Sequence, residues 1–170
     1  MPPDDEKILK IKTVTLRYIE FEDRMRMAAR LDGHGQMVFW LTLRHCQRIV
    51  PALVKCLESK HDGETAIDRS LTLSCRQHAA EWEQRKKPSA EPVLPSGEEH
   101  SLLPRQVTVA CGEKSAALLF PLEDGKSVKL LMNFQELLQW LGILYRQFRH
   151  AGWPLNVWPE WFTGGPHGMN

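Results

Sequence analysis

Residues 133–162 have the sequence NFQELLQWLGILYRQFRHAGWPLNVWPEWF, which joins a predicted helix to a tail with three of the six tryptophans. Asn133 is placed to cap the first turn, and Glu136 occupies the position of a capping-box carboxylate. Gly152 is the residue type that ends a helix in the left-handed conformation. The apolar residues between these ends recur at helical spacing and define one broad face: Phe134, Leu137, Leu138, Leu141, Leu144, Tyr145 and Phe148. We therefore expect a buried helix over residues 134–151.

Short runs of alternating apolar residues predict six strands on either side of a helical middle section. These runs cover residues 8–21, 24–31, 37–44, 107–111, 116–122 and 128–132. In the first run the alternation changes phase, which predicts a β-bulge near Thr13. Turns of the Asp-Gly kind at residues 32–35 and 123–126 predict that the flanking strands pair as hairpins.

Two helices are predicted between the strand groups. The first covers residues 45–60, and Pro51 either lies close to its start or kinks it. The second begins at a cap, Asp68 or Ser70, and runs to about Lys86. Its apolar residues align on one face, which is predicted to be the core face: Leu71, Cys75, His78, Ala79 and Trp82.

The element order predicts an α+β fold, with an antiparallel β-sheet of hairpins, an inserted helical pair and a C-terminal helix packed on the sheet. At 170 residues the chain is interpreted as a single domain spanning 1–170. Within it, residues 1–7 are predicted to be frayed, residues 88–105 a flexible connection, and residues 163–170 a disordered tail. The order strand, turn, strand, helix occurs at residues 24–60 and again at residues 115–151. Either an internal duplication or two unrelated hairpin-plus-helix units would explain this repeat.

This order of elements over residues 8–150 resembles the head domains of DNA end-joining scaffold proteins and of centriolar cartwheel scaffold proteins. In those families strands, a helical pair, more strands and a C-terminal helix follow one another. The chain departs from that pattern because its last helix stops at Gly152 and does not continue as a long coiled coil. The resemblance implies a non-enzymatic, self-associating module, and it transfers no residue roles.

Composition and charge are those of an ordinary soluble protein. Hydrophobic residues make up 42% of the chain and charged residues 25%, and the formal net charge is +1. Nucleic-acid-binding domains usually have a pronounced basic excess, which is absent here. The acidic N-terminus predicts no export signal, and no apolar run is long enough for a membrane span. The four cysteines lie in apolar patterns, so we expect reduced thiols, a cytoplasmic location and no membrane association.

Candidates for chemistry are weak. Cys75 and His78 are three residues apart on a predicted helix and could share a metal ion, with His45 and Cys46 completing a ligand set. Structural zinc sites usually have two closely spaced ligand pairs, so buried packing is the favoured explanation of these residues. We therefore predict no catalytic residues, no metal site and no cofactor, and a metal-dependent or thiol enzyme is the least favoured function.

Two groups of residues are candidates for binding. Basic residues at two helix ends could contact nucleic acid: Arg85, Lys86, Lys87, Arg146 and Arg149. Large aromatic rings follow the last helix in a proline-interrupted segment: Trp153, Trp158, Trp161 and Phe162. These rings either pack back on their own domain or anchor a second chain. The leading interpretation is a non-catalytic interaction or assembly module that forms a homodimer or binds a protein partner; the alternative is a nucleic-acid-associated accessory protein.

Overall fold

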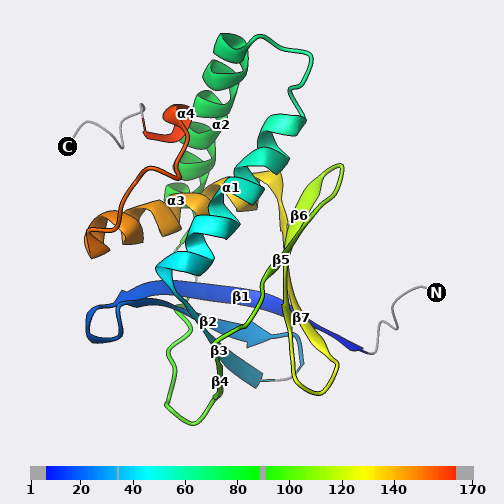
Figure 1. Cartoon of the computed structure of the whole chain (residues 1–170), viewed down its shortest axis with the longest axis vertical. Helices are drawn as coiled ribbons and strands as arrows, with labels where there is room; N and C mark the ends of the chain where they lie inside the picture. Colours follow the sequence, from blue (N-terminus) through cyan, green and yellow to red (C-terminus); the bar gives the residue numbers. More distant parts are fainter. Residues whose placement is uncertain (1–6, 34, 89–90, 164–170) are drawn as a thin grey trace.

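The computed structural model describes residues 7–33, 35–88 and 91–163, and it shows an α+β fold with the helices on one side of a curled sheet (Figure 1). The strands are β1 (Ile8–Ile19), β2 (Arg24–Leu31), β3 (Gly35–Leu41), β4 (His100–Leu102), β5 (Thr108–Cys111), β6 (Ser115–Pro121) and β7 (Ser127–Asn133). The helices are α1 (Leu43–Ser59), α2 (Ala66–Lys86), α3 (Phe134–Ala151) and the short α4 (Glu160–Thr163), and a 3-10 turn, η2 (Glu20–Glu22), follows β1.

The seven strands form one mixed sheet in the order β4-β3-β2-β1-β7-β6-β5. Pairing is antiparallel within β1–β2–β3 and within β5–β6–β7, whereas β1–β7 and β3–β4 are parallel. The prediction of antiparallel hairpins is therefore correct within each half and wrong at the two parallel junctions. The halves meet where residues 8–10 pair with residues 127–129. In each half, three antiparallel strands precede a helix.

The helices form two layers above the sheet. Helix α3 contacts β1, β6 and β7, and α1 contacts β3 and β5, so these two helices cover the sheet. Helix α2 packs on α3 and α4 and forms the outer layer. Phe39 of β3 and Phe120 of β6 are fully buried, with ring centroids 4.6 Å apart, so the two halves of the sheet share one core.

Local signals at the ends of α3 are confirmed. The Asn133 side chain accepts a hydrogen bond from the Glu136 N–H at 2.8 Å, and the Glu136 carboxylate accepts one from the Asn133 N–H at 3.0 Å. Gly152 follows the helix with φ of +69°, a conformation that glycine adopts without strain. The bulge predicted near Thr13 is also confirmed, because the β1–β2 register shifts between Ile11 and Thr13.

The two middle helices begin earlier than predicted. Thr42 caps α1, so Pro51 lies well inside the helix. Its ring is on the exposed side, where water can bond to the carbonyl that loses its partner. Thr65 caps α2 by accepting a hydrogen bond from the Asp68 N–H at 3.2 Å, so neither Asp68 nor Ser70 is the cap.

The connection predicted to be flexible over residues 88–105 contains a strand. Residues 100–102 form β4, which adds in parallel to the edge of β3. Val93 is buried, and its N–H donates to Thr15 Oγ of β1 at 2.9 Å. Glu99 accepts hydrogen bonds from the N–H groups of Ser96 and Gly97. A three-residue strand such as β4 is too short to show an alternation of apolar and polar side chains, so the sequence pattern did not predict it.

The predicted terminal segments fall mostly outside the described residues. Residues 1–6 of the predicted frayed start and residues 164–170 of the predicted tail are not described, whereas Thr163 belongs to α4. Within the described part of the chain, no helix combines the length and apolar character that crossing a bilayer requires.

Candidate interaction surface

Helix α2 has a polar buried side. Gln77 and Glu81 are only 1% and 5% exposed. Gln77 Nε2 donates to Glu81 Oε1 at 2.9 Å and to the Leu138 carbonyl of α3 at 3.1 Å. Gln139 Nε2 of α3 donates in return to the Ala80 carbonyl at 2.9 Å. Buried polar groups are tolerated when they are bonded in this way, so α2 is attached to α3 by hydrogen bonds as well as by the packing of Leu73 and Ala80.

Gly142 lets the two helices approach at this crossing. A Cβ atom at this position would lie 2.7 Å from Glu81 Oε1 and 3.1 Å from Gln77 Nε2. Arg146, one turn further along α3, places a guanidinium nitrogen 4.0 Å from Glu81 Oε1. The crossing therefore contains a carboxylate, an amide and a nearby cation, where the sequence pattern predicted an apolar contact.

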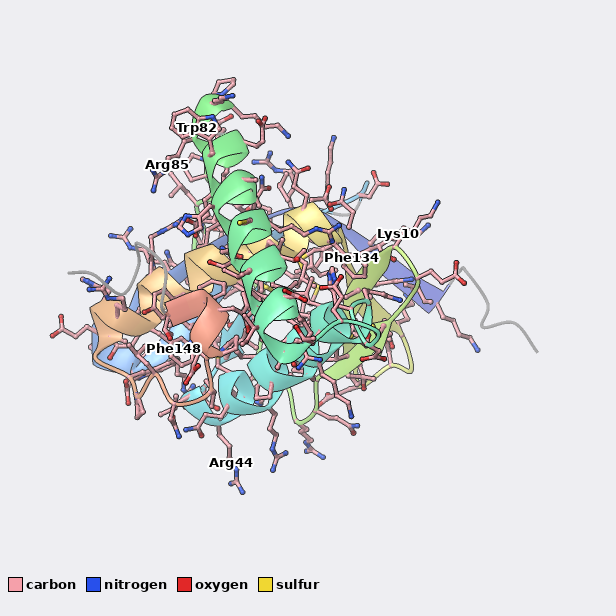
Figure 2. All side chains as sticks on the ribbon, turned by 90° about the horizontal axis from the view of Figure 1, so that it is seen from above. Lys10, Arg44, Trp82, Arg85, Phe134 and Phe148 are labelled. Atoms are coloured by element: carbon pink, nitrogen blue, oxygen red, sulfur yellow. The ribbon has the colours of Figure 1, made fainter. Side chains whose placement is uncertain are left out.

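The apolar side of α2 faces outward. Ile67, Leu71 and Trp82 are 74%, 61% and 59% exposed, and Cys75 is also exposed. These residues and half-buried His78 lie at helical spacing, and we call the five the α2 stripe. Of the predicted core face, Leu71, Cys75, Ala79 and Trp82 are exposed and none of the five residues is fully buried, so that prediction is wrong. Figure 2 shows α2 as the uppermost element, with Trp82 and Arg85 near its end.

The physical reason is the position of α2 in the outer layer. A helix in an outer layer, packed here on α3 and on the short α4, buries a narrow strip of its surface, formed by Leu73, Gln77, Ala80 and Glu81. Gln77 Nε2 and the Glu81 carboxylate have partners within this strip and on α3, whereas the α2 stripe takes no part in these bonds. Large apolar side chains in water at regular spacing are typical of a surface that contacts another chain.

Opposite charges mark the two ends of α2. Asp62, Glu64 and Asp68 lie at or before its start, and Arg85, Lys86 and Lys87 lie at its end. All six residues are exposed. Lys86 Nζ lies 5.4 Å from the Trp82 ring centroid, a cation–π distance, and 3.6 Å from Glu83. The α2 stripe therefore has an acidic patch at the N-terminal end of the helix and a basic patch at the C-terminal end.

The aromatic tail packs on its own chain. Trp153, Trp158, Trp161 and Phe162 are all buried. Of the two alternatives for these rings, packing on their own domain describes this structure, and their contact with a partner chain stays a prediction.

Specific contacts fix this tail. The Trp153 ring packs edge-on against Phe148 of α3, and its indole N–H donates to Asp23 at 3.1 Å. That bond, with a second from the Tyr18 hydroxyl, lowers the pKa of Asp23. The Trp161 indole N–H donates to Glu58 of α1 at 3.1 Å. The tail therefore closes the space beside α1 and α3.

The predicted nucleic-acid contacts lie on two helices that cross. Arg85, Lys86 and Lys87 are exposed at the end of α2, and Arg146 and Arg149 are exposed on α3. Arg146 is adjacent to the Glu81 carboxylate, and Lys86 is adjacent to Glu83. Nucleic-acid contact by these residues stays a prediction.

The proposed metal ligands have other surroundings. His45 Nε2 lies 2.8 Å from the Pro104 carbonyl oxygen, and Cys46 is fully buried, which raises the pKa of its thiol to about 12. Cys75 lies on the exposed side of α2. Across residues 7–33, 35–88 and 91–163, no three His, Cys, Asp or Glu side chains are grouped so that they could hold a metal ion.

One cysteine contact was not predicted. Buried Cys56 of α1 and exposed Cys111 of β5 have thiols within hydrogen-bond reach, and burial together with this neighbour raises the pKa of Cys56 to about 12. The two residues are distant in sequence and share no motif, so only the fold reveals their contact.

Comparison with known proteins gives no relative: no protein-family model, curated protein or solved structure matches the chain.

Proposed function

We propose that the chain is a non-catalytic assembly module that self-associates through the α2 stripe. The observation that supports this proposal is the outward orientation of Ile67, Leu71 and Trp82 on a helix whose buried strip includes the polar residues Gln77 and Glu81. A surface helix of a monomer would normally have the reverse arrangement.

The strength of association follows from the size of the α2 stripe. Burying a large apolar side chain contributes about 1.5–3 kcal/mol when it is complete. Three side chains per copy, each roughly 60–75% exposed, would contribute about 6–12 kcal/mol over two copies. Association itself costs about 4–15 kcal/mol. At its most favourable the balance is about 8 kcal/mol, which corresponds to a Kd of about 1 µM, so we expect a weak dimer with a Kd of about 1 µM or higher.

Sedimentation equilibrium of the full chain from about 1 to about 500 µM detects a dimer whose Kd lies within this range of concentrations. The expected result is a mass that rises from monomer to dimer. Leu71→Glu, which introduces a charge in the middle of the α2 stripe, should keep the chain monomeric. Leu131→Glu is the matched control, since Leu131 is 55% exposed on β7, away from α2, and this variant should dimerise like the wild type.

Two results would overturn the proposal. One is a wild-type chain that stays monomeric throughout the range. The other is a dimer that Leu71→Glu leaves intact. Circular dichroism of both variants checks that the fold is unchanged, and little loss of stability is expected because both positions are exposed.

Association with nucleic acid is the alternative proposal. It is supported by the exposed cations Arg85, Lys86 and Lys87 at one helix end. Filter binding to single- and double-stranded DNA and RNA at low salt tests it, with a steep loss of affinity expected as salt increases. Absence of binding at low salt removes this alternative.

A further inference from the structure

We infer that two copies of the chain pair through antiparallel α2 helices, related by a twofold axis that passes next to Ser74 and Cys75. This inference rests on the proposed self-association and adds its geometry. It commits to a second copy as the partner that covers the α2 stripe.

The first support is the spacing of the α2 stripe. In an antiparallel pair centred between Ser74 and Cys75, Ile67 of one copy lies opposite Trp82 of the other. Leu71 then lies opposite His78, and the two Cys75 residues lie beside the axis. Each large aliphatic residue therefore meets an aromatic ring, and each contact occurs twice, as a twofold interface requires.

The second support is the distribution of charge. The antiparallel arrangement brings the acidic start of one α2, at Glu64 and Asp68, beside the basic end of the other, at Arg85 and Lys86. A parallel pair would instead place acidic start against acidic start and basic end against basic end. Like charges in contact oppose association, so the charges favour the antiparallel arrangement. The dipoles of two antiparallel helices attract each other, which also favours this arrangement.

Among residues 7–33, 35–88 and 91–163, no segment of the chain covers Ile67, Leu71 and Trp82, which stay exposed. A groove between α2 and α4, lined by Ser70, Leu71 and Trp161 among others, has about 440 Å³ of open space beside the stripe. Small serines along this groove let a second helix approach closely.

The geometry at the axis makes Cys75 a natural probe. Helices in contact have axes about 8–10 Å apart. Two Cys75 residues near the axis then have Cα atoms about 4–6 Å apart, which overlaps the range found in disulfides. Oxidation with copper(II) phenanthroline should join them: two copper(II) ions accept one electron each, the S–S bond forms, and the two thiol protons go to the buffer.

The first experiment uses full-length Cys111→Ser, in which Cys75 is the remaining exposed cysteine of the chain. Non-reducing electrophoresis after oxidation should show a covalent dimer. The dimer should be lost when Leu71→Glu is added and when Cys75→Ser replaces the probe. Covalent dimer that persists with Leu71→Glu would show random collision and would overturn the inference.

The second experiment separates antiparallel from parallel pairing. Ile67→Cys and Trp82→Cys are made in separate chains that both carry Cys75→Ser and Cys111→Ser, with tags of different length. Positions 67 and 82 are about 22 Å apart along a helix. Antiparallel pairing predicts that neither variant crosslinks with itself, whereas the mixture gives a heterodimer band. Both new cysteines are at exposed positions, so the core is unchanged.

The outcomes distinguish this inference from the proposed function. Each variant crosslinking with itself would show parallel pairing, and the antiparallel inference would be wrong. No crosslink in any variant, with a dimer in sedimentation that Leu71→Glu abolishes, would also reject this geometry while self-association stands. A monomer in sedimentation would reject the proposed function itself.

Discussion

Replacing Phe162 by alanine tests whether the aromatic tail is part of the core. Phe162 is 0% exposed, and its ring centroid lies 5.1 Å from that of Tyr145 and 4.8 Å from that of Trp158. Removal of a fully buried phenylalanine costs about 3–5 kcal/mol, from lost transfer free energy and from the cavity left behind. For a chain of this size, 1 kcal/mol lowers the Tm by about 2–4 °C. The expected decrease in Tm is therefore about 6–20 °C.

The assay is urea unfolding followed by circular dichroism, with calorimetry for the Tm, at a concentration where the chain is monomeric. Leu155→Ala is the control, because Leu155 lies in the same tail and is 37% exposed. It should cost less than about 1 kcal/mol. If Phe162→Ala were as mild as Leu155→Ala, the tail would not contribute to the core, and its rings would again be candidates for partner binding.

Three further predictions concern the cysteines, a turn and the helix crossing. Ellman's reagent should modify Cys75 and Cys111 in the folded chain, and the two buried thiols, whose pKa is raised to about 12, only after unfolding. The Ser96 N–H and its neighbours lower the pKa of Glu99 to about 2. The carboxylate therefore stabilises the fold fully above about pH 4.3 and loses this effect as the pH falls toward 2, so the stability difference from Glu99→Gln, measured by urea unfolding, should shrink over that interval. Gly142→Ala should destabilise the wild type by about 1–3 kcal/mol, because the added methyl group meets Glu81. In a Glu81→Ala background, where the tight contact with Gln77 remains, it should destabilise less. Equal effects in the two backgrounds would contradict the contact with Glu81.

The sequence predicted those parts of the fold that depend on interactions between residues close together in the chain, such as helix caps and hairpin turns. The capping pair Asn133 and Glu136, with Gly152 at the other end, defined α3 because capping involves residues three or four apart. The same holds for the β2–β3 and β6–β7 hairpins, whose turns lie between the paired strands. The parallel junctions were not predicted, because they join segments that are far apart in the sequence and leave no local pattern.

The residues of the α2 stripe were predicted to share one face of a helix, but that face was predicted to be buried and is exposed. Periodicity identifies which residues of α2 share a face, and that part of the prediction holds for Leu71, Cys75 and Trp82. Periodicity does not state whether the face is inside or outside. The decision depends on Gln77 and Glu81, which look like surface residues until their partners on α3 are known.

The junction between β1 and β7 also governs the order in which the sheet can form during synthesis. The ribosome releases β1 first, and its pairing segment, residues 8–10, must wait for residues 127–129. Until then the N-terminal half presents an open strand edge, a known site of unwanted pairing between nascent chains. Joining the two halves closes a loop of most of the chain, and such long-range pairing slows folding. Completion of the sheet is therefore a late event, and it coincides with the arrival of α3, which packs across both halves.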